Sequence, residues 1–259
     1  MIYNKVVKMC FNLIYFGKFD KRVFRRIAID KSRYNKDGYF IESNDIYLRT
    51  LSFPNFISEI DKIVDGSKEL IHLHMRQRTV GKVNEENIHG WKFANWTFSH
   101  NGHVYGLKSD DGHSDSFNLF KKITESLTYD NVKLKELKTI IENSGFYGVA
   151  FLLNRQNKRL VVISADKHAN IFRKDDYTII SNEPIDDLLF SRKIKYLGVS
   201  MVKLDYEYGY FNNKIVYIDL EKEKVLNSIN ISVKRQDYRD LSRYGVYIKD
   251  DWREYYRFI

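Results

Sequence analysis

The chain has 259 residues with a formal net charge of +9, and its 43% hydrophobic and 30% charged residues are ordinary proportions for a soluble globular protein. The length fits one domain with a tail. The only cysteine, Cys10, excludes an intrachain disulfide and a metal site built from several cysteines, and it indicates a reducing compartment, most simply the cytoplasm.

The N-terminal run MIYNKVVKMCFNLIYF is hydrophobic enough to resemble a signal peptide. Lys5 and Lys8 interrupt the apolar residues, and no small-residue cleavage site follows. No other segment approaches the ~20 consecutive apolar residues that a membrane helix needs. We therefore predict a soluble protein without a membrane partner.

A basic cluster follows from Gly17 to Lys36, with eight Lys or Arg against two Asp. We interpret it as a helix with a solvated basic face and Val23, Phe24 and Ile27 turned inward together with Ala28. The alternative is a binding site for nucleic acid or for an acidic protein. Nucleic acid is not the favoured partner, because clusters of this size are common on basic proteins.

The next elements follow from periodicity. The run YFIESNDIYLRT predicts a hairpin that turns at Ser43, Asn44 and Asp45. After Pro54, apolar residues at helical spacing predict a helix that continues until Gly66. ELIHLHMR and WKFANWTFSH then return to strand character.

Two more helices are predicted, one opening at Ser114 and one spanning 130–143. From Tyr147 onward the chain reads mostly as strands: YGVAFLLN, RLVVISAD, NIFRK, YTIISNE, KYLGVSMVKL and KIVYIDL. Grouped strands with helices bunched between them predict two stacked sheets flanked by helices, not regular βαβ alternation. The segment 230–259 is predicted to be a C-terminal extension, either packed as an appendage or mobile.

Common catalytic motifs are absent from the sequence: there is no Walker loop, no dinucleotide glycine fingerprint and no His-Glu-x-x-His. His72 and His74 share a predicted strand face, and His100 and His103 lie close by in the sequence, an arrangement that a histidine metal site could use. No carboxylates stand at a matching spacing. We predict neither a metal nor a cofactor.

Several short motifs occur together in a fixed order. KMCFNLIYFG places the cysteine on a first strand, RYNKDGYFI supplies a turn before a hairpin, and HMRQRTVG is followed by NIHG, SHNG, SDSF, GFYGVA and SNEP. In this order they resemble the motifs of class II glutamine amidotransferase domains, whose pattern includes His-x-Arg-x-Ala-Thr-x-Gly, Asn-x-His-Pro, His-Asn-Gly and Ser-Asp-Thr-Glu. The resemblance runs from Cys10 to about Pro184.

The resemblance implies an α+β fold over residues 10–229: the four-layer αββα sandwich of the N-terminal-nucleophile hydrolases, with mostly antiparallel sheets. It also implies that the thiol of Cys10 is activated by the α-amine of the same residue, which is neutral in a useful fraction near neutral pH. That amine exists only if residues 1–9 are a propeptide that is removed. The alternative is that Cys10 is a buried core cysteine.

The resemblance also implies roles for individual residues. The implied catalytic residues are Cys10, Asn101 and Gly102, and the implied substrate-binding residues are Arg76, Thr79, Gly81, His89 and Asp115. Arg76 would bind the substrate carboxylate and Asp115 its ammonium group, while Asn101 and Gly102 would form the oxyanion hole.

Each implied role has a structural alternative. Arg76 could be a surface charge at a strand end, Asn101 and Gly102 a hairpin turn, and the pair Ser114 and Asp115 a helix cap. The sequence also departs from the family pattern, most clearly where Phe11 replaces a glycine. The other departures are Arg78 for alanine, Val80 where a histidine is frequent, and Gly90 for proline.

The predicted function is a glutaminase that hydrolyses the side-chain amide of glutamine through a Cys10 thioester. Ammonia would pass to an unidentified acceptor or to a separate synthase subunit that docks on the basic segment or the tail. One alternative is a catalytically retired scaffold that binds protein or nucleic acid. Another is an unrelated hydrolase that uses His89 or His100 as the base for its cysteine.

Overall fold

Strand β1 (Phe11–Lys18) lies in the middle of the first of two sheets. The computed structural model describes residues 10–63, 68–79, 81–107, 112–174, 177–183, 210–211 and 213–232. The predicted propeptide 1–9 and residues 233–259 of the predicted extension lie outside the described residues, as does the predicted strand KYLGVSMVKL.

The first sheet has seven described strands in the order β11-β9-β10-β1-β4-β2-β3, and each neighbouring pair is antiparallel. Besides β1, its strands are β2 (Tyr39–Glu42), β3 (Tyr47–Thr50), β4 (Lys68–Met75), β9 (Ala169–Lys174), β10 (Tyr177–Ser181) and β11 (Tyr210–Phe211). Phe11 pairs with Met75. Residue 10 therefore leaves the sheet beside the end of β4, where the loop that starts at Arg76 begins.

The second sheet has six described strands in the order β13-β12-β8-β7-β6-β5, again with antiparallel neighbours. Its strands are β5 (Trp91–Phe93), β6 (Trp96–Val104), β7 (Phe146–Asn154), β8 (Arg159–Ala165), β12 (Lys214–Asp219) and β13 (Lys224–Asn230). The register places Gly102 of β6 opposite Gly148 of β7.

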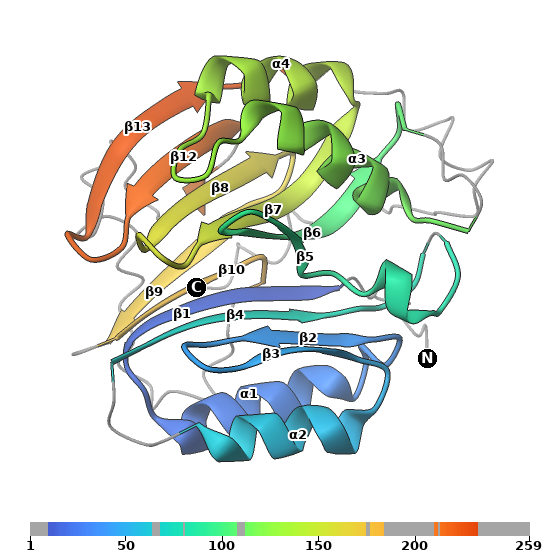
Figure 1. Cartoon of the computed structure of the whole chain (residues 1–259), viewed down its shortest axis with the longest axis vertical. Coiled ribbons are helices and arrows are strands. Elements are labelled where there is room, and N and C mark those ends of the chain that lie inside the picture. The colour runs from blue at the N-terminus through green and yellow to red at the C-terminus, as the bar shows by residue number, and fades with distance from the viewer. Residues whose placement is uncertain are drawn as a thin grey trace, which may run out of the picture. The chain divides into compact units, whose positions relative to one another are not determined.

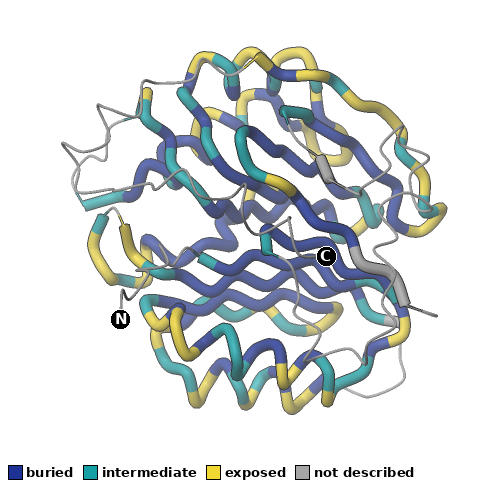
Figure 2. Tube along the Cα trace, turned by 180° about the vertical axis from the view of Figure 1, so that it is seen from behind, coloured by how far each residue is buried: buried dark blue, intermediate teal, exposed yellow. Residues whose placement is uncertain are grey.

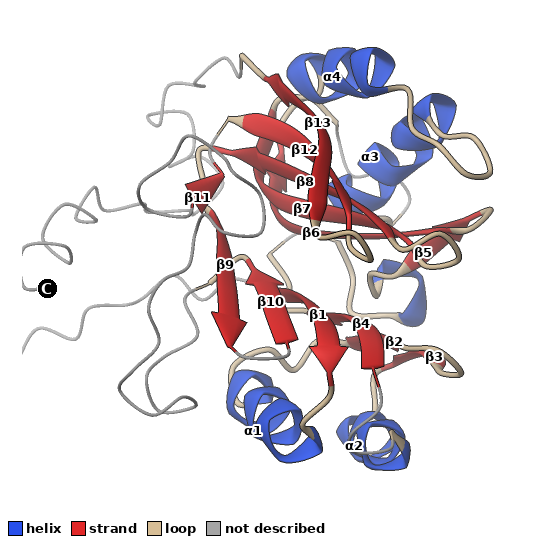
Figure 3. Cartoon of the chain, turned by 90° about the vertical axis from the view of Figure 1, so that its left-hand side faces the viewer, coloured by secondary structure: helices blue, strands red, loops and turns tan. Residues whose placement is uncertain are grey.

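Helices cover the outer face of each sheet (Figures 1 and 3). The helices α1 (Lys21–Ser32) and α2 (Phe53–Lys62) lie against the first sheet, and α3 (Asp115–Ile123) and α4 (Leu134–Asn143) against the second. Two short 3-10 helices, η1 (Glu85–Asn87) and η2 (Thr124–Ser126), complete the described helices. None of the described helices combines the length and the apolar character that crossing a membrane requires.

Three apolar clusters fill the three spaces between these four layers. Figure 2 shows that most strand residues are buried, whereas the helices combine buried and exposed residues. Alternation along β1 shows how the sequence builds them: Leu13 and Tyr15 pack toward α1 and α2, whereas Ile14 packs toward the second sheet. On the far side, the second sheet and its helices share a cluster that contains Trp96 and Phe98. The prediction of an α+β four-layer αββα sandwich with antiparallel sheets is confirmed.

The basic cluster forms α1, as predicted. Asp20 caps the helix by accepting hydrogen bonds from the backbone N–H groups of Arg22 and Val23, at 2.9 and 3.3 Å. Phe24 is fully buried, while Arg25 is exposed and pairs with Asp61 at 2.9 Å. The interpretation as a solvated helix face with an apolar inner side is confirmed.

Element boundaries differ from the prediction in three places. The helix predicted to continue until Gly66 ends at Lys62, because Ile63 has an extended backbone. WKFANWTFSH forms two strands joined by a turn in which Ala94 has a φ of 49°. The helix predicted for 130–143 begins at Leu134, because a turn comes first: the N–H of Thr128 donates to the carbonyl of Asn131 at 2.9 Å. The predicted hairpin between β2 and β3 is confirmed.

Candidate active site

Cys10 stands immediately before β1, and its backbone is held by Asn182, which follows β10. Nδ2 of Asn182 donates to the Cys10 carbonyl at 3.2 Å, and Oδ1 accepts the N–H of Asn12. The backbone N–H of Asn182 donates to the Asn12 carbonyl at 3.2 Å. One side chain thus fixes the chain on both sides of residue 11.

The thiol of Cys10 is half-buried and contacts the backbone of Gln77. Sγ donates to the Gln77 carbonyl and accepts the Gln77 N–H, each at 3.3 Å. Burial raises the pKa of Cys10 to about 11, although the Gln77 N–H and the charge of Arg76 act to lower it. The thiol is therefore protonated at neutral pH, and a nucleophilic role requires a base.

Arg76 follows β4 and is only 2% exposed, so the reading as a strand-end surface charge is wrong. Its Nη1 donates to the carbonyl of Lys82 at 2.8 Å, and its backbone N–H donates to the carbonyl of Gly38 at 2.8 Å. Burial lowers the pKa of Arg76, and the nearby groups of Cys10 and Asp115 raise it. The guanidinium is a buried cation within electrostatic range of the thiol.

The loop after Arg76 is attached to the start of α3. The side chain of Asn87 donates to the carbonyls of Lys82 and Gly112, at 3.1 and 2.7 Å, and accepts the N–H of Ser114 at 2.7 Å. Gly81 has a φ of +75°, and a Cβ there would lie 3.3 Å from the backbone of Ser114. The glycine therefore permits a close approach between the loop and the helix.

Thr79 lies in the same loop, and its side chain is exposed. Its neighbour Val80 lies outside the described residues. The structure thus brings Arg76 and Gly81 to the start of α3 but leaves Thr79 on the surface.

Asp115 is the first residue of α3 and is 7% exposed. Its Oδ2 accepts the N–H of Val104 at 2.7 Å, and its Oδ1 accepts the N–H of Ser116 at 2.8 Å. Ser114 is the N-cap of the helix, since its Oγ accepts the N–H of Phe117 at 3.3 Å. Asp115 ties the helix to the end of β6, and its charge raises the pKa of Cys10.

Asn101 and Gly102 lie inside β6, so the reading of this pair as a hairpin turn is wrong. Asn101 is 2% exposed, and its Oδ1 has no hydrogen-bond partner among the described residues. Strand alternation places its side chain on the same face as Ser99, whose Oγ contacts Asn12 of β1 across the sandwich at 2.7 Å. Asn101 therefore faces the sheet that carries Cys10.

Gly102 is required by the close approach of β7. Its φ is +154°, and a Cβ at this position would lie 1.9 Å from the carbonyl oxygen of Tyr147. The same atom would lie 2.7 Å from Nε2 of His100. No larger residue fits without moving the backbone of β7.

His89 is buried between the loop and β6. Its Nδ1 accepts the N–H of His100 at 3.0 Å, and its ring stacks on that of His74 with the centroids 3.8 Å apart. Burial lowers the pKa of His89 well below its ordinary value. His89 is therefore a neutral ring with Nε2 protonated, and it supports β6 from the side.

The other histidines near the site are also buried. The ring nitrogens of His100 contact Oγ of Ser116 at 2.9 Å and the carbonyl of Tyr147 at 3.1 Å, and burial lowers the pKa of His100 to about 4. Among the described residues, no group of three or more His, Cys, Asp or Glu is placed to hold a metal ion.

Two residues of this region, Asn182 and Lys167, are not predicted from the sequence as parts of the site. Asn182 belongs to the SNEP motif, but its role as a clamp depends on the pairing of β10 with β1. Lys167, in the turn before β9, has a pKa lowered by burial to about 8, while the charges of Glu183 and Cys10 act to raise it. Neither contact has a signature in the local sequence.

Comparisons with known proteins bear on the fold. No protein-family model and no curated protein sequence matches the chain. Among solved structures, glutamine phosphoribosylpyrophosphate amidotransferase from B. subtilis, complexed with ADP and GMP, matches 87% of this chain and 50% of its own chain with a TM-score of 0.55 and 14% identity. A structure of the allosteric regulatory enzyme of purine biosynthesis matches 87% of this chain and 49% of its own with a TM-score of 0.56 and 14% identity.

A predicted glutamine amidotransferase from Pseudomonas aeruginosa is also similar, with a TM-score of 0.44 and 14% identity over 85% of this chain and 100% of its own. The chain spans about half the length of the first two structures. Their likeness, at low identity, concerns the fold. The chain has the αββα fold of the first two structures, and the resemblance that its motifs predict is confirmed at the level of the fold.

Proposed function

We propose that the chain is a glutaminase of the class II amidotransferase type, which hydrolyses the side-chain amide of glutamine to glutamate and ammonia. The observation that carries the proposal is the position of Cys10. The only cysteine of the chain precedes the central strand of the first sheet, beside the buried cation of Arg76 and on the side that Asn101 faces. The fold shared with amidotransferases supports the same activity.

The proposed base is the α-amine of Cys10, released when residues 1–9 are removed. Two observations support an amine over an imidazole. The hydrogen bonds to Sγ within the described residues come from the backbone of Gln77. The nearby rings of His89 and His100 are buried, have lowered pKa values and are engaged in hydrogen bonds of their own. A hydrolase that uses one of these histidines is therefore not favoured.

In the proposed reaction, the α-amine takes the thiol proton and Sγ attacks the side-chain carbonyl carbon of glutamine. The side-chain N–H of Asn101 and the backbone N–H of Gly102 donate to the oxyanion, and each such donor contributes ~10²- to 10³-fold in rate. The α-ammonium then gives its proton to the departing ammonia, which leaves a thioester on Cys10. Water, deprotonated by the same amine, attacks the thioester and releases glutamate with the thiol restored.

Free glutamine carries a carboxylate and an ammonium group, and the site offers a cation for the carboxylate and an anion for the ammonium group. We assign the carboxylate to Arg76, whose planar guanidinium matches it, with Gly81 shaping that end of the site and the exposed Thr79 at its edge. We assign the ammonium group to Asp115. The side chain of Asn87 joins the Lys82 carbonyl, which Arg76 also contacts, to the start of α3, where Asp115 lies; this supports their placement around one substrate. In this proposal His89 supports the pocket wall.

Ammonia released by the site needs an acceptor. We propose that a separate acceptor or synthase subunit uses the ammonia. The exposed face of α1, which carries Arg22, Arg25 and Arg26, is the proposed docking surface. An unpaired catalytic thiol fits the reducing conditions of the cytoplasm.

A second candidate is a catalytically retired scaffold that binds protein or nucleic acid. The observation that favours it is the half-buried thiol of Cys10, whose pKa is raised by burial, as is typical of an inert cysteine. In that case Cys10 would keep an amide nitrogen and would need no base.

Intact mass and N-terminal sequencing of the purified protein, combined with a glutaminase assay, test the proposal. We expect a mature form that begins at Cys10, that releases glutamate from glutamine, and whose Cys10 is labelled by 6-diazo-5-oxo-norleucine. A chain that keeps Met1 and shows neither activity nor labelling would favour the retired scaffold. Activity with Met1 still present would refute the amine base.

A further inference from the structure

A chain of hydrogen bonds between buried polar side chains crosses the space between the two sheets. Oγ of Ser99 lies 2.7 Å from Oδ1 of Asn12 and 2.5 Å from Nε2 of His72. Nδ1 of His72 lies 3.1 Å from Oγ1 of Thr97, which donates to Oε2 of Glu42 at 2.7 Å. All five side chains are at most 4% exposed.

The chain of bonds joins the two sheets repeatedly. Asn12, Glu42 and His72 belong to β1, β2 and β4 of the first sheet, whereas Thr97 and Ser99 belong to β6 of the second. None of the four contacts lies within a single sheet, because each of them joins a residue of the first sheet to a residue of the second. These hydrogen bonds therefore fix the position of β6 relative to the strands of the first sheet.

The surroundings of these hydrogen-bonded side chains are apolar. The same space between the sheets is otherwise filled by residues such as Ile14, Val149 and Phe151. A polar group buried there without a partner costs about 1–3 kcal/mol, and even a satisfied hydrogen bond adds only about 0.5–1.5 kcal/mol. Well-packed apolar side chains of similar volume would stabilise this layer at least as much as these polar ones. The polar residues instead give the two sheets a defined relative position, because their hydrogen bonds are directional.

The bond between Asn12 and Ser99 has a particular position relative to the candidate active site. Asn12 is two residues after Cys10, and Ser99 is two residues before Asn101. Ser99 and Asn101 both belong to β6, where residues two apart lie on the same face and about 6.6 Å apart. Cys10 directly precedes β1, which contains Asn12. The bond thus links the segment that carries the nucleophile to the strand that carries the oxyanion-hole residue, and each bonded residue is two positions from the residue of the site.

The backbone connection strengthens this link. The N–H of Asn12 is bound by Oδ1 of Asn182, whose Nδ2 holds the carbonyl of Cys10. A shift of Asn12 would therefore pass to residue 10 through one side chain. On the other strand, Ser99 and Asn101 share one extended segment of β6.

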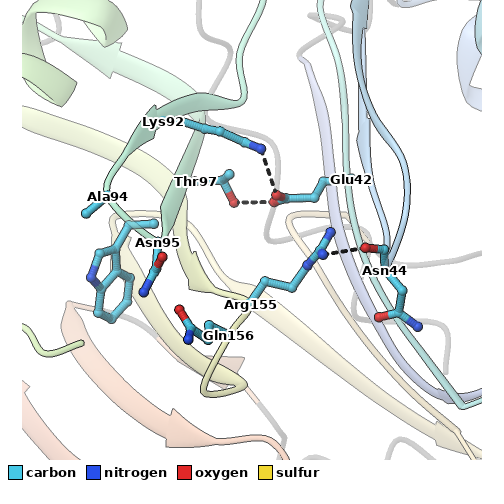
Figure 4. A pocket seen from close by; sticks show the side chains of 9 residues that line it. Glu42, Asn44, Lys92, Ala94, Asn95, Thr97, Arg155 and Gln156 are labelled. Carbon is cyan, nitrogen blue, oxygen red and sulfur yellow. Dashed lines mark hydrogen bonds and ion pairs between the residues drawn. The ribbon is translucent and has the colours of Figure 1, made fainter. Parts of the chain in front are cut away.

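The far end of the chain of bonds reaches a cavity of about 420 Å³ (Figure 4). Glu42 and Thr97 line it together with Lys92, whose Nζ lies 3.4 Å from Oε1 of Glu42. The carboxylate of Glu42 is thereby held from two sides, by a hydroxyl of β6 and by a cation of β5. This anchored carboxylate orients Thr97, Thr97 contacts the ring of His72, and Ser99 lies between that ring and Asn12.

We propose that Asn12 and Ser99 are positioning residues, whose hydrogen bond across the sandwich sets the spacing between Cys10 and Asn101, with His72, Thr97 and Glu42 holding Ser99 in place. The proposal rests on the glutaminase function proposed above. Neither residue contacts the reacting atoms. Both act by keeping the nucleophile and the oxyanion donor at the distance that attack on an amide requires, and a displacement of about 1 Å can cost ~10²-fold in rate.

Kinetics of three variants of the full chain, Ser99→Ala, Asn12→Leu and the double variant, test the proposal. We expect each single variant to lower kcat by about 10- to 100-fold with KM for glutamine within about twofold of the parent. The double variant should be no worse than the poorer single variant, because both changes remove the same bond. The matched control is Ser126→Ala, which removes an equally buried hydroxyl that bonds the carbonyl of Ile123 at 2.7 Å, far along the chain from the site.

Two results would overturn the positioning role: unchanged kcat in the single variants after correction for folded protein, or losses that multiply in the double variant. A parent chain without glutaminase activity would defeat the proposed function instead. The positioning role is then decided by crystal structures of the parent and of Ser99→Ala. We expect the Cα distance between Cys10 and Asn101 to change by about 1 Å, and an unchanged distance would refute the role.

Discussion

The side-chain amide of Asn182 holds the backbone of Cys10, donating to its carbonyl at 3.2 Å while Oδ1 accepts the N–H of Asn12. The contact is possible because Ser181, the last residue of β10, pairs with Leu13 of β1. An amide with one donor and one acceptor facing the same strand can satisfy both backbone groups at once. The position of the candidate nucleophile thus depends on a residue far away in the sequence.

Replacement of Asn182 by leucine is expected to lower both activity and stability. Two buried backbone groups lose their partner, which costs about 1–3 kcal/mol for each unsatisfied group. Asn182→Asp distinguishes the contributions of the two hydrogen bonds, since it keeps the acceptor for the N–H of Asn12 but loses the donor to the carbonyl of Cys10. Denaturant unfolding and kcat of both variants measure the effects. Asn157→Ala, which removes an amide that bonds the carbonyl of Asp130 at 2.9 Å, is the control and should retain kcat.

Substitution of Gly102 by alanine is expected to prevent folding or to destabilise the protein severely. The new Cβ would lie 1.9 Å from the carbonyl oxygen of Tyr147, so β6 and β7 would have to separate. Gly112→Ala is the control, since Gly112 also has a positive φ but its Cβ would meet only the flexible side chain of Lys82, at 3.5 Å. Soluble yield and the free energy of unfolding measure the difference. Equal tolerance of both substitutions would contradict the packing argument.

The sequence predicts the layers of this fold because they follow from local periodicity. The alternation along β1, with Tyr15 toward the helices and Ile14 toward the second sheet, and the helical spacing in α2 are visible without any knowledge of pairing. Boundaries are less predictable. The late start of α4 depends on a turn closed by Thr128 and Asn131, which competes with the first turn of the helix.

The candidate site is only partly predictable for the same reason. The motifs located Cys10, Arg76 and Asn101, but they did not indicate that Asn101 lies within a strand and faces the first sheet. The buried hydrogen bonds that involve His72 and Ser99 also have no signature in the local sequence. Both residues read as ordinary polar positions of strands until β4 and β6 are placed on facing sheets, since strand pairing and sheet packing decide which side chains meet.

Acid is expected to destabilise the protein through its buried histidines. Burial lowers the pKa of His72 to about 3 and that of His100 to about 4, and it also lowers those of His74 and His89. The unfolded chain therefore binds more protons than the folded protein below the ordinary histidine pKa of about 6.5. The stability is fully present above that pH and is lost as the pH falls toward 4, by up to about 1.4 kcal/mol per pH unit for each histidine.

Denaturant unfolding at several pH values between about 7.5 and 4.5 measures this loss. His89→Gln keeps an acceptor for the N–H of His100 but removes one titrating ring, so its stability should depend less steeply on pH. Ser126→Ala is the control, because it changes a buried side chain that does not titrate and should leave the pH dependence unchanged. A stability that does not fall between about pH 6.5 and 4.5 would show that these rings are accessible to protons in the folded state.

The two arginines of HMRQRTVG should differ in their effect on glutamine binding. Arg76 is buried beside Cys10, whereas Arg78 is exposed and its backbone N–H donates to Oδ2 of Asp37 at 2.7 Å. A lysine at position 76 keeps the charge but loses the planar pair of donors that fits a carboxylate. Loss of a hydrogen bond to a charged group costs about 1.5–3 kcal/mol, which corresponds to a Kd raised by about 10- to 150-fold.

Calorimetric titration of glutamine into the Cys10→Ser protein isolates binding from turnover. Arg76→Lys in that background should weaken binding as stated, and Arg78→Lys should leave Kd within about twofold. If Arg78→Lys has the larger effect, the exposed arginine binds the substrate carboxylate and Arg76 has a structural role through the carbonyl of Lys82. The comparison is well matched, because both variants make the same chemical change two residues apart in one loop and differ only in burial.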